Sequence, residues 1–171
     1  MNTSIVLTII ANDQPGIIKT VSTVLANHGG NWIQSSMSSL AGQFAGILLV
    51  SIPQEKTEAC LAELHRLESS GLRIIAHAGG AATVTQNTNT YALDLIGNDR
   101  PGIVHEITSL LTRHNVSVRE FETTVEGASM GGGELFKATA KLVIPEVTDI
   151  ESLETELEDL ADDLMVTIEF T

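Results

Sequence analysis

The chain has 171 residues, of which 43% are hydrophobic and 18% are charged, and its formal net charge at pH 7 is −13. This composition is typical of a globular protein, and the acidity argues against direct binding to the phosphates of duplex DNA. No apolar run approaches the roughly 20 residues that cross a bilayer, and a single cysteine, Cys60, excludes an intrachain disulfide. We therefore expect a cytoplasmic protein that neither binds a membrane nor contacts nucleic acid directly.

The negative charge is concentrated in the second half of the chain. Residues 1–86 carry a net charge of −1, whereas residues 87–171 carry −12. The simplest interpretation of this acidity is solubility, and attraction of a basic protein partner is the alternative.

The first half alternates strand-like and helix-like segments. Strands are indicated by short apolar runs, and helices by apolar residues that recur every three to four positions. A Leu-Ala-Gly turn at 40–42 separates the two middle strands, and Pro53 ends the second of them. In chain order, the pattern predicts a strand at 5–11, a helix at 17–25, strands at 32–37 and 45–52, a helix at 60–67 and a strand at 72–76.

The second half follows the same plan after a polar segment of small residues at 83–89, which we interpret as a linker. The predicted domains are therefore residues 1–82 and 90–171. The glycines at 131–133 indicate a longer hairpin between the two middle strands. The predicted segments are a strand at 91–97, a helix at 103–111, strands at 116–125 and 135–144, a helix at 150–160 and a strand at 164–170.

A nearly identical six-residue motif occurs once in each half, directly after the first strand. It reads NDQPGI at 12–17 and NDRPGI at 98–103, a spacing of 86 residues. The similarity continues into the helices, where His28 matches His114, so a whole unit is duplicated. Each half reads β-α-β-β-α-β, which predicts the α+β class and two ferredoxin-like units, each with an antiparallel sheet and its helices on one face.

The motif has a structural and a functional interpretation. Proline presets φ for helix entry and glycine allows a tight turn, while Asp13 could accept hydrogen bonds from amides of the first helical turn. The functional interpretation adds a ligand. The amides of a helix N-terminus favour a carboxylate, and Asp13 or an asparagine could hold an ammonium group, so a free amino acid fits.

The sequence shows no catalytic constellation, and we predict a protein that is not an enzyme. The five histidines are scattered, and His28 and His114 occupy matching helix ends, where a cation favours the helix dipole. Cys60 lies on the apolar side of its predicted helix and has no activating base nearby. Metal-ligand spacing and nucleotide-binding glycine motifs are absent, so we expect no metal and no cofactor.

The repeated motif and the order of predicted elements resemble those of a known protein family. Tandem β-α-β-β-α-β units with a D-x-P-G-[IV] loop after the first strand resemble the ACT domain family of small-molecule-binding regulatory modules. The resemblance covers both halves. It implies that an amino acid binds at interfaces between paired units, through the loop before the first helix and the start of the second strand. Ala11 and Gly97 stand where some serine-binding members have histidine, so serine specificity is not implied. The implied ligand-binding residues are Asn12, Asp13, Pro15, Gly16, Ile17 and Asn31 in the first unit, and Asn98, Asp99, Pro101, Gly102, Ile103 and Ser117 in the second.

A chain made of two such units also resembles the glycine cleavage system transcriptional repressor group. That resemblance implies a regulator that contacts a DNA-binding activator and responds to glycine, with a homodimer as a possible assembly. The alternative is an amino-acid-binding module that controls a metabolic enzyme. We expect the first-unit site, with Asn31, to be preferred, because the second unit carries the negative charge and offers Ser117 in place of an amide.

Overall fold

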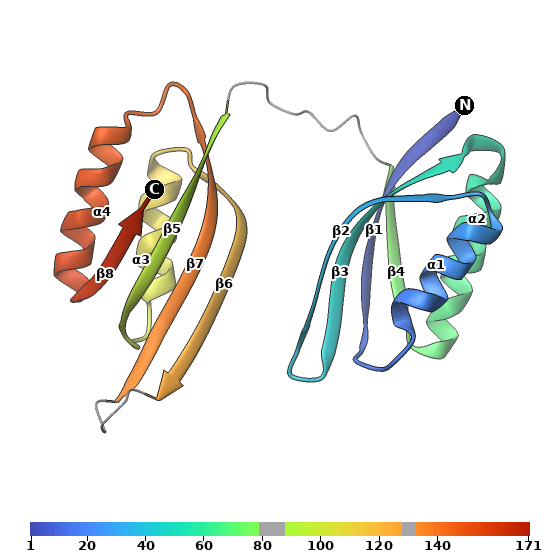
Figure 1. Cartoon of the computed structure of the whole chain (residues 1–171), viewed down its shortest axis with the longest axis horizontal. Helices are drawn as coiled ribbons and strands as arrows, with labels where there is room; N and C mark the ends of the chain where they lie inside the picture. The colour runs from blue at the N-terminus through green and yellow to red at the C-terminus, as the bar shows by residue number, and fades with distance from the viewer. Residues whose placement is uncertain (79–87, 128–132) are drawn as a thin grey trace. The chain divides into compact units, whose positions relative to one another are not determined.

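The computed structural model of the chain describes residues 1–78, 88–127 and 133–171 (Figure 1). The chain divides into two compact units, Met1–Val84 and Thr85–Thr171. Residues 83–87 of the predicted linker and residues 131–132 of the predicted glycine hairpin lie outside the described residues. Residues 88 and 89, which we assigned to the linker, belong instead to the first strand of the second unit.

The first unit contains the six main elements that its sequence predicts, each within a few residues of the expected bounds. Short 3-10 turns, Gln54–Lys56 and Leu67–Ser70, flank the second helix. The elements are β1 (Asn2–Asn12), α1 (Ile17–Asn27), β2 (Asn31–Leu40), β3 (Gln43–Pro53), α2 (Thr57–Arg66) and β4 (Arg73–Ala78).

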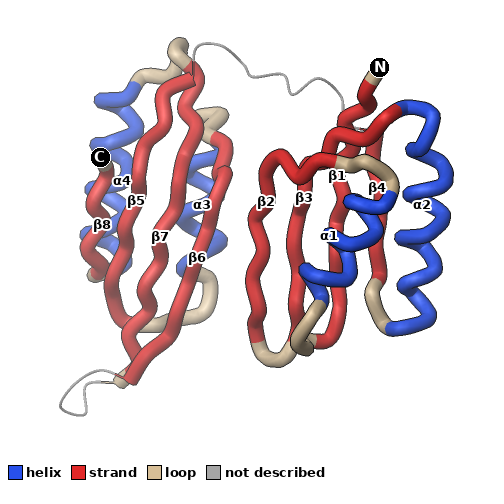
Figure 2. The backbone as a smooth tube through the Cα atoms, turned by 45° about the vertical axis from the view of Figure 1, so that its right-hand side comes forward, coloured by secondary structure: helices blue, strands red, loops and turns tan. Residues whose placement is uncertain are grey.

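The four strands form one antiparallel sheet in the order β2-β3-β1-β4, so β1 and β3 are central. Helices α1 and α2 cover one face of this sheet, and the other face carries no helix of the unit (Figures 1 and 2). Alternate residues of β1, such as Leu7 and Ile9, are buried beneath the helices. Cys60 of α2 lies in the same core, as its position in the apolar pattern predicts.

The second unit repeats this architecture. Its sheet has the order β6-β7-β5-β8, again antiparallel, with two helices on one face (Figure 2). The elements are β5 (Thr88–Asn98), α3 (Ile103–Arg113), β6 (Ser117–Gly127), β7 (Glu134–Pro145), α4 (Ile150–Leu164) and β8 (Val166–Phe170). The predicted α+β class, with two ferredoxin-like units, is confirmed.

The duplication extends to irregular features. The register between the two middle strands shifts between Trp32 and Gln34 in the first unit and between Val118 and Glu120 in the second, 86 residues later. Such a shift marks a β-bulge, which bends the edge strand at its start. Both copies of the unit therefore have this bulge at the same position.

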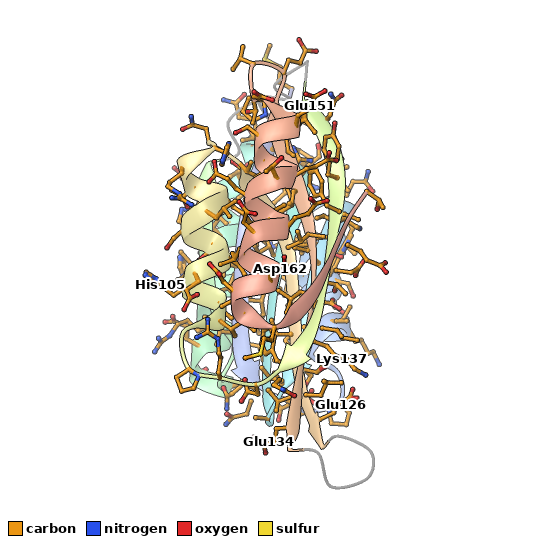
Figure 3. The ribbon with its side chains drawn as sticks, turned by 90° about the vertical axis from the view of Figure 1, so that its left-hand side faces the viewer. His105, Glu126, Glu134, Lys137, Glu151 and Asp162 are labelled. Carbon is orange, nitrogen blue, oxygen red and sulfur yellow. The ribbon has the colours of Figure 1, made fainter. Side chains whose placement is uncertain are left out.

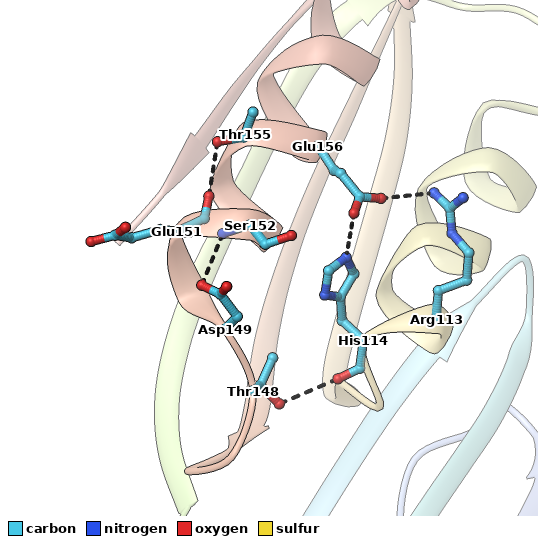
Figure 4. A network of polar contacts seen from close by, with 8 residues as sticks. All are labelled: Arg113, His114, Thr148, Asp149, Glu151, Ser152, Thr155 and Glu156. Atoms are coloured by element: carbon cyan, nitrogen blue, oxygen red, sulfur yellow. Dashed lines mark hydrogen bonds and ion pairs between the residues drawn. The ribbon is translucent and has the colours of Figure 1, made fainter.

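A histidine joins the two helices at the same place in each unit. The Nε2 atom of His28 lies 2.8 Å from Oε2 of Glu63, and that of His114 lies 3.0 Å from Oε1 of Glu156. In the second unit Arg113 also contacts Glu156, at 3.2 Å (Figure 4). Each histidine caps the C-terminus of its helix, as predicted, and the carboxylate that it contacts comes from the neighbouring helix. These contacts give both histidines a structural role.

The acidic residues of α4 surround a buried leucine stripe formed by Leu153, Leu157 and Leu164. Glu151 and Asp162 mark the two ends of this helix (Figure 3). No helix in the described part of the chain is long and apolar enough to cross a membrane.

Candidate functional site

The loop between β1 and α1 places the first copy of the motif at the surface. Asn12 ends β1, and every residue from Asn12 to Gly16 is exposed. Gly16 has φ = 96° and is the N-cap of α1, a left-handed conformation that suits glycine. Ile17 is only 4% exposed and packs in the core, so its side chain anchors the helix and cannot reach a ligand at the surface.

The β2–β3 hairpin holds this loop from the side. The hydroxyl of Ser39 donates to Oδ2 of Asp13 at 2.6 Å, and Nε2 of Gln43 donates to Oδ1 of Asn12 at 2.9 Å. The backbone amide of Asp13 donates to the carbonyl of Gly42 at 2.9 Å. The capping role predicted for Asp13 is therefore wrong, because its carboxylate turns towards the hairpin.

The N-terminus of α1 consequently has no side-chain cap among the described residues, and no acidic residue occupies its first turn. A Cβ atom placed on Gly16 would find no atom within 4 Å, so the space above this glycine is open. Uncapped N–H groups and the helix dipole together favour an anion. The arrangement suits a small carboxylate that approaches the backbone at Gly16.

The second copy of the motif has the same backbone but a different environment. Gly102 has φ = 92° and starts α3, while Ile103 is 3% exposed and packs in the core. Glu106 lies in the first turn of α3 and accepts a hydrogen bond from Nη2 of Arg100 at 2.8 Å. A carboxylate of the chain therefore lies near this helix N-terminus, where it disfavours a second carboxylate.

The remaining second-loop residues, Asn98, Asp99 and Pro101, are exposed like their first-unit counterparts. The amide of Asp99 donates to the carbonyl of Glu134 at 2.9 Å, which matches the contact between Asp13 and Gly42. Residues equivalent to Ser39 and Gln43 differ, since Val125 and Leu135 stand in their places. Two loops of nearly identical sequence are thus held by different side-chain contacts.

The predicted residues at the start of the second strand lie far from the loop of their own unit. Asn31 pairs with Ser51 of β3, whereas Asn12 at the loop pairs with Gln43 at the other end of the same strand. Eight residues of β3 separate these pairs, which corresponds to about 26 Å. Ser117 in the second unit is separated from its loop in the same way. A single unit therefore cannot place both groups on one small ligand.

Cys60 and a hollow on the second sheet are two further features with reactive or charged side chains. Burial raises the pKa of the Cys60 thiol, and the charge of Glu63 raises it further, so this thiol stays protonated at neutral pH. A hollow on the helix-free face of the second sheet is lined by Asp94, Lys137 and Glu169, and none of the predicted ligand residues lines it. No group of three or more metal-ligating side chains occurs in the described part of the chain.

Comparison with known protein families gives two matches in tandem. A family profile described as ACT domain matches residues 3–75, and a second profile described as ACT domain matches residues 91–164. The chain belongs to the ACT domain family. The first match runs from β1 into β4, and the second runs from β5 to the end of α4. Both copies of the motif therefore lie within an ACT domain. ACT domains support a regulatory role in which a small molecule is sensed.

Solved structures resemble this ACT domain protein over its full length. A crystal structure of an unknown protein from Galdieria sulphuraria has a TM-score of 0.89 at 26% identity and covers 99% of this chain and 98% of its own. A "putative glycine cleavage system transcriptional repressor" has a TM-score of 0.70 at 16% identity, with 100% and 97% coverage. The second likeness shows a shared fold. A search of curated protein sequences found no match.

Proposed function

We propose that this tandem ACT protein is a non-enzymatic regulator that senses a small amino acid, with glycine as the first candidate. The observation that carries the proposal is the uncapped N-terminus of α1, with open space above Gly16 and no acidic residue in its first turn. A carboxylate finds free N–H groups there, and a ligand without a large side chain fits against a glycine backbone.

The likeness to the glycine cleavage system repressor supports glycine as the ligand and transcription as the controlled process. The chain is too acidic to hold DNA by itself, so control would pass through a DNA-binding protein partner. The second unit, with its net charge of −12, is the part of the chain that attracts a basic protein surface. We also propose a cytoplasmic location.

The proposed site centres on the first loop, with Asn12, Asp13, Pro15 and Gly16. The backbone of Ile17 contributes an amide while its side chain stays in the core. The second loop, with Asn98, Asp99, Pro101, Gly102 and Ile103, is the weaker site, because the carboxylate of Glu106 lies in the first turn of α3, near the helix N-terminus. Asn31 and Ser117 can take part only if another copy of the chain brings the start of its second strand to the loop.

A thermal-shift screen of the twenty amino acids tests the ligand. A ligand at 100 times its Kd adds about 2.7 kcal/mol to the unfolding free energy. We expect glycine or another small amino acid to raise the melting temperature, and uniform inactivity of all twenty would contradict the proposed sensing role. Affinity purification from cells then tests the partner. Recovery of a helix-turn-helix protein supports transcriptional control, whereas recovery of a metabolic enzyme favours the alternative that the module regulates catalysis.

A further inference from the structure

The helix-free face of the first sheet is unusually apolar for a surface exposed within its unit. Alternation along the strands turns Ile10, Ile47 and Ile75 away from the helices, and these side chains are 42%, 57% and 43% exposed. The register places Ile47 and Ile75 on either side of Thr8, so they lie in one row across β3, β1 and β4. Antiparallel sheets that face water usually carry polar residues on that side, and contiguous apolar patches mark contacts.

The second unit provides an internal control for this observation, because its sheet has the same topology and register. The row equivalent to Thr8, Ile47 and Ile75 is formed by Asp94, Thr139 and Glu169. The difference extends across the whole face. The helix-free face of the second sheet carries the charged side chains Asp94, Glu120, Glu122, Glu126, Lys137, Lys141 and Glu169.

Both lysines are paired within the face. Lys137 contacts Glu126 at 2.8 Å (Figure 3), and Lys141 contacts Glu120 at 2.8 Å. The second sheet therefore presents a solvated surface. The residues at the equivalent positions of the first sheet are all uncharged. Among its described residues, only Arg73 and His77 on the edge strand β4 can carry charge on this face. The two units thus share one fold, but the helix-free face of the sheet is charged in the second unit and largely apolar in the first.

We propose that the helix-free face of the first sheet, formed by β2, β3, β1 and β4, is a self-association surface that packs against the same face of a second copy of the chain. Two antiparallel sheets stack with their strands within about 30° of each other and about 10 Å apart, with the side chains of both faces interdigitating. A two-fold axis along the strands places β3 of one copy over β1 of the other, so the isoleucine rows meet.

The charge distribution favours association of two copies through their first sheets over association through their second sheets. Contact through the first units brings together regions of net charge −1, whereas contact through the second units would oppose regions of −12. With the axis along the strands, β4 stacks over β2 of the other copy. Arg73 and His77 then face the serine-rich edge strand and not each other.

The size of the face fits a reversible dimer. Four strands of about eight residues span roughly 19 Å by 26 Å, which gives about 500 Å² on each copy. The two faces together reach about 1,000 Å², close to the lower limit of about 1,200 Å² for specific interfaces, and side-chain relief adds to the area. We therefore expect an association that depends on concentration.

Sedimentation velocity of the full chain, from micromolar to millimolar concentration, tests the proposal. The second sheet suggests the substitutions, because its residues are compatible with the fold. Ile75→Glu copies Glu169 and Leu49→Lys copies Lys141. The matched control is Ile96→Lys, at the second-unit position equivalent to Ile10 and 45% exposed. Circular dichroism melting of each variant verifies that it folds.

We expect the wild-type chain to dimerise and the control variant to dimerise equally. Ile75→Glu and Leu49→Lys should each weaken dimerisation by ~10-fold or more, because a buried unpaired charge opposes contact. A wild-type chain that is monomeric at every concentration would overturn the proposal. So would a dimer that both folded variants retain, since it must use another surface. If Ile96→Lys dissociates the dimer as well, the second sheet takes part and the assignment to the first sheet is wrong.

Discussion

Replacing Gly16 by alanine separates the structural and the ligand-binding roles of the motif. Gly16 has φ = 96°, and an added Cβ would meet no atom within 4 Å. The substitution therefore costs backbone strain without a packing clash. An alanine in this left-handed region costs about 1–2 kcal/mol, which for a unit of this size lowers the melting temperature by about 4–16 °C.

Gly102→Ala is the matched control for this prediction. Gly102 has φ = 92°, and the nearest atom to its added Cβ is Oε1 of Glu106 at 3.8 Å, an ordinary van der Waals distance. The two substitutions should destabilise their units by similar amounts. Any difference between them in ligand binding then reports the use of one loop over the other.

The assay is isothermal calorimetry with the amino acid that gives the largest thermal shift, below the melting temperature of both variants. We expect Gly16→Ala to lose most of the binding, because the new methyl group occupies the space through which a carboxylate approaches the helix amides. Gly102→Ala should bind as the wild-type chain does. Equal affinities in both variants would refute the reasoning, and loss of binding in Gly102→Ala alone would move the site to the second unit.

Three further predictions concern other parts of the chain. If a second copy brings the Asn31 amide to the loop, Asn31→Ala should weaken binding of the best ligand by about 1–3 kcal/mol in calorimetry. Ser117→Ala should leave binding unchanged. The reverse pattern would contradict the preference for the first unit. Cys60 should react with a thiol reagent only after unfolding, and because its pKa is raised in the folded state, the unfolding free energy should fall as the pH rises above the ordinary thiol value of about 8.5. Cys60→Ala should remove that alkaline loss, and rapid labelling of the native thiol would show that burial does not protect it. The purified chain should give no mobility shift with duplex DNA at physiological salt, and a shift without any partner would disprove the expectation drawn from its charge.

The elements of each unit were predictable because their signals are local. The isoleucines and valines of α1 recur every three to four residues, which defines a buried face whatever the rest of the chain does. The turn at Ala41 and Gly42 was also predictable, and both residues have positive φ, as a type I′ two-residue hairpin requires. The motif itself predicted a strand, a turn with glycine and a helix start, and each copy has this arrangement.

The contacts of the candidate site were not predictable from the motif. Asp13 looked like a helix cap because it precedes the helix, but its carboxylate meets Ser39, which lies 26 residues away in the sequence. The hydroxyl is available only because β3 lies between β1 and β2 and brings the hairpin end beside the loop. Arg100 and Glu106 were missed for a different reason. The single-letter difference between the two motif copies, Gln14 against Arg100, was the available signal for that ion pair.

The sequence by itself determined the duplication, the order of strands and helices, and the tight glycine turn before the first helix of each unit, because each depends on a few neighbouring residues. Only the tertiary structure decided which residues share a site. Asn31 and the loop at Asn12 belong to the same unit, and both were predicted to bind the ligand. The antiparallel pairing of β2 with β3, however, places Asn31 at the opposite end of the sheet from this loop. The distance between two residues of a sheet depends on the order and direction of the strands. The side-chain pattern of one strand shows which of its faces is buried, but it does not show which end of that strand lies beside a given loop.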